Sequence, residues 1–328
     1  MSVTGLRRMA GGASREIWSL DVSLERAPGR RETLPLVLRR DPAGRVGDGG
    51  DRGAEFRVLR AAWRGGVRVP RVHWASHDGA GLGAPFFLMD RVAGETLPRR
   101  LLREDRYAGT RAGLAAELGA MLARIHALDL TDPDLADLAD LAPPPADRSP
   151  AQREVERVAQ GIRELAVEPH PVLDLAERWL HARTPTPSRI ALVHGDYRIG
   201  NVLFDETGMR AILDWELMHV GDPIEDLGWL CMRAWRFGAS LPVGGVGTRE
   251  QLVEAYERAS GTRVDLEALR FWEAFGSFKL ALVFLMQSRV YLDGRVRSVE
   301  LASLGRRTAE TEDELLRFLR DEAEPGGT

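Results

Sequence analysis

An aspartate and an asparagine with a defined spacing follow a short apolar run in the middle of the chain. Asp196 comes two residues after His194, Asn201 lies five positions further on, and Asp214 ends a later apolar stretch. In phosphoryl transfer, one carboxylate accepts the proton of the attacking hydroxyl, while an amide and a second carboxylate hold the metal ion. Any one of these residues alone is an ordinary turn residue, but their combined order indicates a phosphoryl-transfer site.

Strand-like segments bracket these residues and must position them. Residues 189–193 predict a strand before the loop, and residues 201–204 and 209–213 predict a hairpin around an Asp-Glu-Thr-Gly turn. The side chains at the strand end and after the hairpin are then expected to face one cleft.

The periodicity of apolar residues changes along the chain. The first 90 or so residues predict short strands and one helix, and the later part predicts amphipathic helices. The expected strands are 16–22, 34–38, 69–74 and 85–89, and the expected helices are 54–63, 114–128, 152–165, 172–182 and one that begins at Asp222-Pro223. We therefore expect an α+β protein with a small antiparallel β-sheet lobe (1–92) and a larger, mainly α lobe (93–328), joined by a hinge near residues 90–93.

The composition excludes several classes of protein. A net charge of −4 over 328 residues gives no general attraction for nucleic acid or an anionic membrane. No apolar run approaches the roughly 20 residues that span a bilayer, and Cys231 is the single cysteine. We expect a cytoplasmic protein that binds neither nucleic acid nor membrane. The sequence does not indicate an oligomeric state.

The sequence lacks the motifs of two other enzyme classes. A serine hydrolase would carry G-x-S-x-G, which is missing. A Walker-type nucleotide hydrolase would carry G-x-x-x-x-G-K-[ST], and the only lysine, Lys279, stands in Phe-Lys-Leu.

The motif around Asp196 resembles that of the aminoglycoside phosphotransferase and choline kinase superfamily. The H-G-D-x-x-x-x-N loop is present at 194–201, and the I-x-D-W-E strand end at 212–216. Within that superfamily, 193–198, 213–217 and 221–223 are most similar to the kinase domain of acyl-CoA dehydrogenase family members 10 and 11. The resemblance extends from about residue 11 to 294 and implies a two-lobed, protein-kinase-like fold that uses ATP and Mg²⁺.

The resemblance also implies roles for single residues. Asp196 would be the catalytic base, with His194 and Arg198 as further catalytic residues of its loop, and Asn201 and Asp214 would bind Mg²⁺. Arg198 stands where protein kinases usually place a lysine that touches the transferred phosphate, and a guanidinium suits phosphate oxygens. Glu216, close to Asp214, is either a further ligand or a residue that braces the loop, and Asp226 is expected to bind the catalytic-loop backbone.

Nucleotide contacts are expected in the first lobe and the hinge. Gly11, Gly12 and Ser14 match the family's phosphate loop, where small residues let backbone N–H groups approach phosphates. Three further groups complete the expected nucleotide site: Arg39, Glu55, and the hinge residues Asp90 and Val92.

Position 39 departs from the family pattern, which places a lysine on this strand to bind the phosphates. Arg39 keeps the positive charge, with Glu55 as its expected partner, but its reach differs from that of lysine. The alternative to an ATP-dependent phosphotransferase with an alcohol acceptor is therefore a non-catalytic, nucleotide-binding pseudokinase.

The acceptor is expected to be a small molecule with a hydroxyl group. Residues 236–307 carry more basic than acidic side chains, which disfavours a polycationic aminoglycoside, whereas the apolar stretch 269–292 either lines an acyl pocket or forms a core helix. Lys279 within that stretch is a candidate contact for a substrate carboxylate or phosphate. The resemblance to the acyl-CoA dehydrogenase-linked kinases implies hydroxylated acyl compounds, which we rank slightly ahead of the antibiotics, choline-like alcohols and sugars that the wider superfamily implies.

Overall fold

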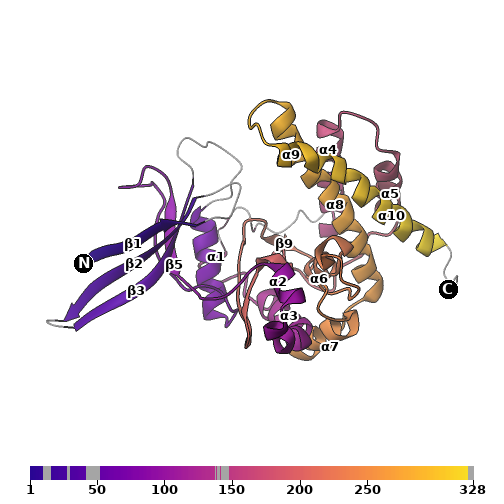
Figure 1. Ribbon diagram of the computed structural model, residues 1–328. Coiled ribbons are helices and arrows are strands. Elements are labelled where there is room, and N and C mark those ends of the chain that lie inside the picture. Colours follow the sequence, from indigo (N-terminus) through magenta and orange to yellow (C-terminus); the bar gives the residue numbers. More distant parts are fainter. Residues whose placement is uncertain are drawn as a thin grey trace.

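The N-terminal part of the chain forms a five-stranded sheet. The computed structural model describes residues 1–9, 16–27, 30–41, 52–136, 138, 141 and 148–323. The antiparallel strands follow the spatial order β1-β2-β3-β5-β4. Helix α1 packs against β4 and β5, so it lies beside the sheet on the side of the helical part (Figure 1). The bounds are β1 Ser2–Arg8, β2 Glu16–Ala27, β3 Arg30–Arg40, α1 Arg52–Arg64, β4 Val72–Ser76 and β5 Phe86–Asp90.

The remainder is mainly helical, with two small β-pairs that carry the loops of interest. Strands β6 (Ala191–Val193) and β9 (His219–Gly221) form one pair, and β7 (Val202–Asp205) and β8 (Gly208–Ile212) form the other. The α-helices are α2 Pro98–Arg103, α3 Ala108–His126, α4 Pro150–Leu165, α5 Pro171–Ala182, α6 Ile224–Cys231, α7 Arg249–Ser260, α8 Leu266–Leu292, α9 Val299–Leu304 and α10 Thr308–Ala323. Short 3-10 turns lie at Asp105–Tyr107, Ile199–Asn201, Arg233–Arg236 and Gly305–Arg307.

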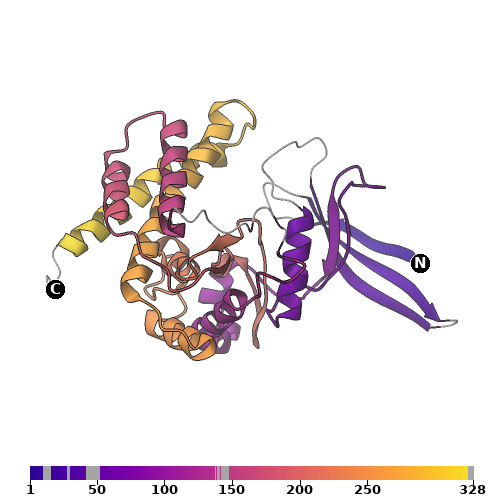
Figure 2. The same ribbon diagram turned by 180° about the vertical axis from the view of Figure 1, so that it is seen from behind.

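Helix α8 is the centre of the helical part. It packs against α6, α4, α5, α9 and α10, and most of its side chains are buried. Its low amphipathicity follows, because a helix covered on all sides needs apolar residues all round. Seen from behind, the sheet and the α8 assembly lie at opposite ends of the molecule, with α3 and the small β-pairs between them (Figure 2). The prediction of a core helix here is confirmed.

The sheet and the helical part share a hydrophobic core. Phe56 and Leu59 of α1 and Phe87 of β5 belong to the same buried cluster as Leu118 of α3 and Ile212 of β8. Burial of this apolar surface is the main force that holds the two parts together. The chain passes from one part to the other directly after β5.

The predicted α+β architecture is confirmed, with small shifts at the element ends. Strand β1 and helix α2 were not predicted, and β4 begins at Val72 rather than at residue 69. Helix α6 begins at Ile224, and the side chain of Asp222 accepts a hydrogen bond from the Ile224 N–H at 3.0 Å. Within the described residues, the structure has no helix that is both long enough and apolar enough to span a membrane.

Candidate active site

The carboxylate of Asp196 is held by three donors in the loop between β6 and β7. Asn201 Nδ2 donates to Oδ2 at 2.7 Å, and Trp229 Nε1 of α6 donates to Oδ1 at 2.9 Å. The Nε of Arg198 lies 3.0 Å from Oδ1 and 3.2 Å from Oδ2. Hydrogen bonds to a charged acceptor are stronger than neutral ones, so this arrangement fixes the direction of the carboxylate.

The backbone before Asp196 is held by a buried acid. Asp226 accepts hydrogen bonds from the N–H groups of His194 at 2.8 Å and Gly195 at 2.9 Å. Gly195 has φ +79°, and a Cβ at this position would lie 2.2 Å from the carbonyl oxygen of Leu217. Only glycine fits this turn without displacing its neighbours. The expected contact of Asp226 with the loop backbone is confirmed.

The position of His194 corrects one prediction. Its side chain has no exposed surface, its Nε2 lies 3.1 Å from the Leu213 carbonyl, and its ring packs on Trp215. Burial lowers the pKa of His194, which favours a neutral ring that donates from Nε2 and accepts the Asp196 N–H at Nδ1. His194 therefore cannot touch a substrate, and it links the loop to the end of strand β8.

That link places Asp214 next to Asn201. The N–H of Leu213 donates to the carbonyl of Asn201 at 2.8 Å, and Asp214 follows with φ +67°. A left-handed conformation at an aspartate stores strain of about 1–3 kcal/mol, and such strain clusters at functional sites. The structure brings the two predicted metal ligands to neighbouring positions at the ends of the β7–β8 pair.

Arg39 connects the sheet to this site. Its Nη1 lies 2.6 Å from Glu55 of α1, and its Nη2 donates to Oδ1 of Asp214 at 2.8 Å. Burial alone would lower the pKa of Arg39, but Glu55 and Asp214 outweigh burial and the pKa is raised. The guanidinium thus stays charged while 8% exposed. The expected pair with Glu55 is present, and the contact with Asp214 was not predicted.

The structure describes two of the remaining residues predicted to contact the nucleotide, Asp90 and Val92. Gly11, Gly12 and Ser14 lie outside the described residues, although the flanking strands pair through the N–H of Met9 and the carbonyl of Ile17 at 2.8 Å. Asp90, at the end of β5, contacts Nε2 of His73 at 2.7 Å, and Val92 is half-buried in the segment that follows. Their contacts with a nucleotide stay predictions.

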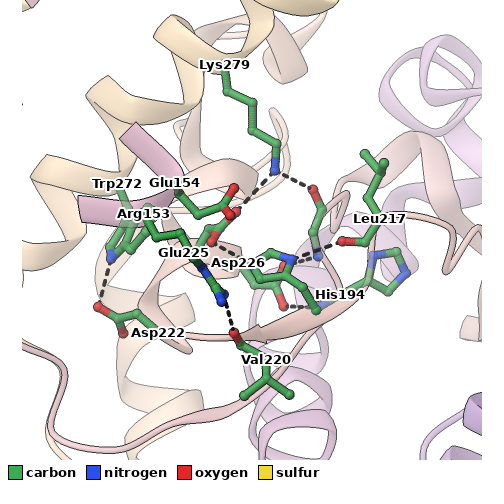
Figure 3. Close-up of polar contacts among 12 residues, drawn as sticks. Arg153, Glu154, His194, Leu217, Val220, Asp222, Glu225, Asp226, Trp272 and Lys279 are labelled. Carbon is green, nitrogen blue, oxygen red and sulfur yellow. Dashed lines mark hydrogen bonds and ion pairs between the residues drawn. The ribbon is translucent and has the colours of Figure 1, made fainter. Parts of the chain in front are cut away.

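Two residues near Asp196 have positions that the sequence did not reveal or had left open. Trp229 was not recognised, since a tryptophan within a helix carries no distinguishing signal. Lys279 is buried, and its Nζ donates to Glu225 at 3.1 Å and to the carbonyl of Gly195 at 3.3 Å (Figure 3). Its exceptional residue type was the only hint of a special position.

The side-chain oxygen atoms of Asn201 and Asp214 are suitable ligands for Mg²⁺. Mg²⁺ is commonly bound through one or two protein oxygen ligands together with phosphates and water. The Asp214 carboxylate has one oxygen toward Arg39 and a side chain that is 36% exposed, which leaves it access to the site. Asn201 turns its Nδ2 toward Asp196, so its Oδ1 faces away from that carboxylate.

A separate groove of about 740 Å³ lies between α7, α8 and α10. Its lining includes Arg236, Arg249, Glu273 and Phe318, and it contains none of the predicted site residues. The groove is therefore not the phosphoryl-transfer site.

A sheet-bearing part, a helical part and this loop arrangement define the protein-kinase-like fold. The chain belongs to the phosphotransferase enzyme family, whose family model matches residues 10–272. It is similar to mouse acyl-CoA dehydrogenase family member 10, with 28% identity over 291 residues, and to chicken acyl-CoA dehydrogenase family member 11, with 28% identity over 309 residues. These matches cover 83% and 88% of this chain but only 26% and 37% of the relatives' own lengths.

Solved structures share the fold at low sequence identity. A Ralstonia eutropha protein described provisionally as an aminoglycoside phosphotransferase has TM-score 0.74 and 24% identity, covering 97% of this chain and 92% of its own. A mutant of aminoglycoside phosphotransferase APH(4)-Ia, in a ternary complex with AMP-PNP and hygromycin B, has TM-score 0.60 and 17% identity, covering 97% and 94%. The resemblance to this superfamily and to acyl-CoA dehydrogenase family members 10 and 11 is confirmed.

Proposed function

We propose that the chain transfers the γ-phosphoryl group of Mg²⁺-bound ATP to a hydroxyl group of a small molecule. The single observation that carries this proposal is that Asp196, Asn201 and Asp214 lie at one site. Asn201 donates to Asp196, and its carbonyl accepts from the N–H of the residue before Asp214. A carboxylate fixed by three donors can accept the hydroxyl proton and orient the oxygen for in-line attack. The likeness to a phosphotransferase solved with AMP-PNP and hygromycin B is consistent with this chemistry.

Each residue then has one task. Asp196 orients the acceptor, Asn201 and Asp214 hold Mg²⁺, and Arg198 lies where its charge can meet the transferred phosphoryl group. Mg²⁺, when bound, neutralises the charge that develops on the phosphate oxygens. His194 holds the loop through its contacts with the Leu213 carbonyl and the Asp196 N–H.

Nucleotide binding is assigned to the sheet side of the site. We place ATP between a first lobe of residues 1–92 and a second lobe of residues 93–328, against Arg39 and the connector that contains Asp90 and Val92. The loop with Gly11, Gly12 and Ser14 would cover the phosphates. Arg39, paired with Glu55, replaces the usual lysine, and this intact pair supports activity over the pseudokinase alternative.

The surroundings of Asp196 favour an acceptor with an apolar part. Trp229, which touches Asp196, forms a buried apolar cluster with Met232, Leu280 and Phe284, and this cluster lies too deep to contact an acceptor itself. The half-buried ring of Trp235 packs against that cluster and under the guanidinium of Arg198, at 4.7 Å. A polycationic acceptor would require acidic side chains in this place. Hydroxylated acyl compounds therefore come ahead of aminoglycosides.

The proposal is tested by ADP release from Mg²⁺-ATP with hydroxyacyl compounds, aminoglycosides, macrolides, choline-like alcohols and sugars. We expect turnover with one class, transfer of phosphate to its hydroxyl by ³¹P NMR, and a loss of about 10²-fold or more in Asp196→Asn. Binding of Mg²⁺-ATP without turnover by any class supports the pseudokinase. Equal turnover by Asp196→Asn would contradict the assignment of the base.

A further inference from the structure

Lys279 occupies an unusual position for a cation. It lies on α8, is 6% exposed, and is the only lysine among 45 basic residues of the chain. Its Nζ donates to Glu225 Oε1 and to the carbonyl of Gly195, and it lies 5.0 Å from the centre of the Trp229 ring. Lys279 thus contacts two groups that adjoin Asp196: the carbonyl of the preceding residue and the indole that donates to its carboxylate.

Trp229 is held from several sides. It is 4% exposed, it packs in the cluster with Leu280 and Phe284, and its ring centre lies 5.4 Å from that of Trp235. Its only polar atom, Nε1, donates to Oδ1 of Asp196. A rotation of this indole would remove one of the three donors of the carboxylate.

We propose that Lys279 and Trp229 are positioning residues for Asp196, with the ammonium group holding both the Gly195 carbonyl and the face of the indole. This inference rests on the proposed phosphotransferase function, for which Asp196 is the base. The charge on Lys279 is the reason that it can do both, because an ammonium group donates in several directions and is attracted to the face of an aromatic ring.

The partner of Lys279 is itself embedded in a polar network. Glu225, 2% exposed, also contacts Nε2 of His219 at 3.0 Å. Burial would raise the pKa of Glu225, but His219 and Lys279 outweigh burial and lower the pKa to about 2. A buried ion pair is weak evidence for stability, since well-packed apolar residues are often equally stable there. We therefore explain the network of Glu225, His219 and Lys279 by the position in which it holds the loop of Asp196, rather than by a gain in stability.

The competing explanation is that the network only joins α6 to α8. The chain contains a matched control for this: Trp272 of α8 is 1% exposed, and its Nε1 donates to Asp222 at 2.9 Å, just before α6. Trp229 of α6 and Trp272 of α8 thus each donate an indole N–H to a carboxylate, and the two helices pack against each other. Only Trp229 touches Asp196.

The test compares Trp229→Phe with Trp272→Phe in the whole chain. We expect both variants to lower Tm, because each loses a buried hydrogen bond. We expect kcat to fall about 10-fold or more in Trp229→Phe with an unchanged KM for ATP, and to stay within about twofold in Trp272→Phe. Equal kcat values in the two variants would overturn the inference for Trp229.

Lys279 needs a second pair of variants, because Lys279→Met leaves Glu225 buried without its cation and can fail to fold. Lys279→Met/Glu225→Gln removes both charges and keeps the shape, and we expect its kcat to fall while its KM for ATP is unchanged. Adding Trp229→Phe to this variant should then lower kcat less than it does in the wild type, because both changes act through Asp196. Full additivity of the two effects would overturn the coupling.

A readout without catalysis separates this inference from the proposed function. In ¹⁵N-tryptophan-labelled protein, the indole N–H resonance of Trp229 is identified by its loss in Trp229→Phe. We expect this resonance to shift in Asp196→Asn and in Lys279→Met/Glu225→Gln, while that of Trp272 stays in place. A wild type that transfers no phosphate refutes the proposed function. An unmoved Trp229 resonance refutes the positioning contact, whatever the activity.

Discussion

Arg39 and Asp214 lie 2.8 Å apart although 175 positions separate them in the chain. The contact joins strand β3 of the sheet to the end of the β7–β8 pair, and Glu55 of α1 completes it at 2.6 Å. The guanidinium of Arg39 therefore binds one carboxylate beside the sheet, that of Glu55, and one in the helical part, that of Asp214.

Replacing Arg39 with methionine should reduce both stability and nucleotide binding. Glu55 would lose this pair while it stays buried, and breaking a buried ion pair costs about 3–5 kcal/mol of the free energy of unfolding. Arg64→Met is the control, because the Arg64 side chain is 45% exposed and Asp134 keeps its pair with Arg60, so that the loss is worth about 1 kcal/mol or less. Urea unfolding and Mg²⁺-ATP titration measure the two effects, and equal losses in both variants would contradict the expectation.

Asp214→Asn should weaken the response to Mg²⁺ while the fold is kept, because asparagine still offers an oxygen to Arg39. We expect turnover to fall about 10²-fold or more, together with a higher Mg²⁺ concentration for half-maximal rate. Asp205→Asn, on the same β7–β8 pair but turned to the Thr207 N–H, should keep wild-type kinetics. A normal Mg²⁺ dependence in Asp214→Asn would refute the metal assignment.

Gly195→Ala should destabilise the protein more than Gly261→Ala, although both glycines have a left-handed conformation. Its Cβ would lie 2.2 Å from the Leu217 carbonyl, whereas Gly261 has a similar φ of +69° and no atom within 4 Å of the added Cβ. We expect about 1–2 kcal/mol of destabilisation in Gly261→Ala and clearly more in Gly195→Ala. Because the backbone shift moves Asp196, kcat should also fall about 10²-fold, and only in Gly195→Ala.

The stability of the wild type should depend on the titration of Asp222. Burial raises its pKa to about 6, although the N–H groups of Ile224 and Trp272 oppose the shift. The folded state then holds a proton that the unfolded state releases near pH 4, so stability falls as pH rises from about 4 to 6.

Asp222→Asn removes this titration. Relative to the variant, the wild type should lose about 2–3 kcal/mol between pH 4 and 7, measured by urea unfolding at each pH. Parallel pH profiles of the two proteins would show that Asp222 ionises in the fold as it does in water.

Much of the candidate site was predictable because its residues are close in sequence. Asp196 and Asn201 share one loop, and the short hairpin that follows has to return Asp214 to that loop. The pairing of Arg39 with Glu55 was predictable from the resemblance, since the family pairs a cation on this strand with an acid on the following helix.

The rest depends on contacts that local patterns do not encode. The bond from Trp229 to Asp196 joins residues 33 positions apart, and that from Lys279 to Gly195 spans 84 positions. The motif also could not tell which side of its loop faces the core, which is why His194 was given a direct part in catalysis. For Lys279 the sequence left both a substrate contact and a core position open, and packing of α6 against α8 decides for the core.

The donors of Asp196, which are Asn201, Trp229 and Arg198, all belong to the helical part, whereas Asp214 is also bound through Arg39 to the sheet. A hinge motion between the sheet and the helices would therefore leave the acceptor half of the site rigid and change only the nucleotide half. Under the proposed function, the hydroxyl compound would then be bound by the helical part alone, and only the binding of the phosphate donor would depend on how the sheet is placed against it.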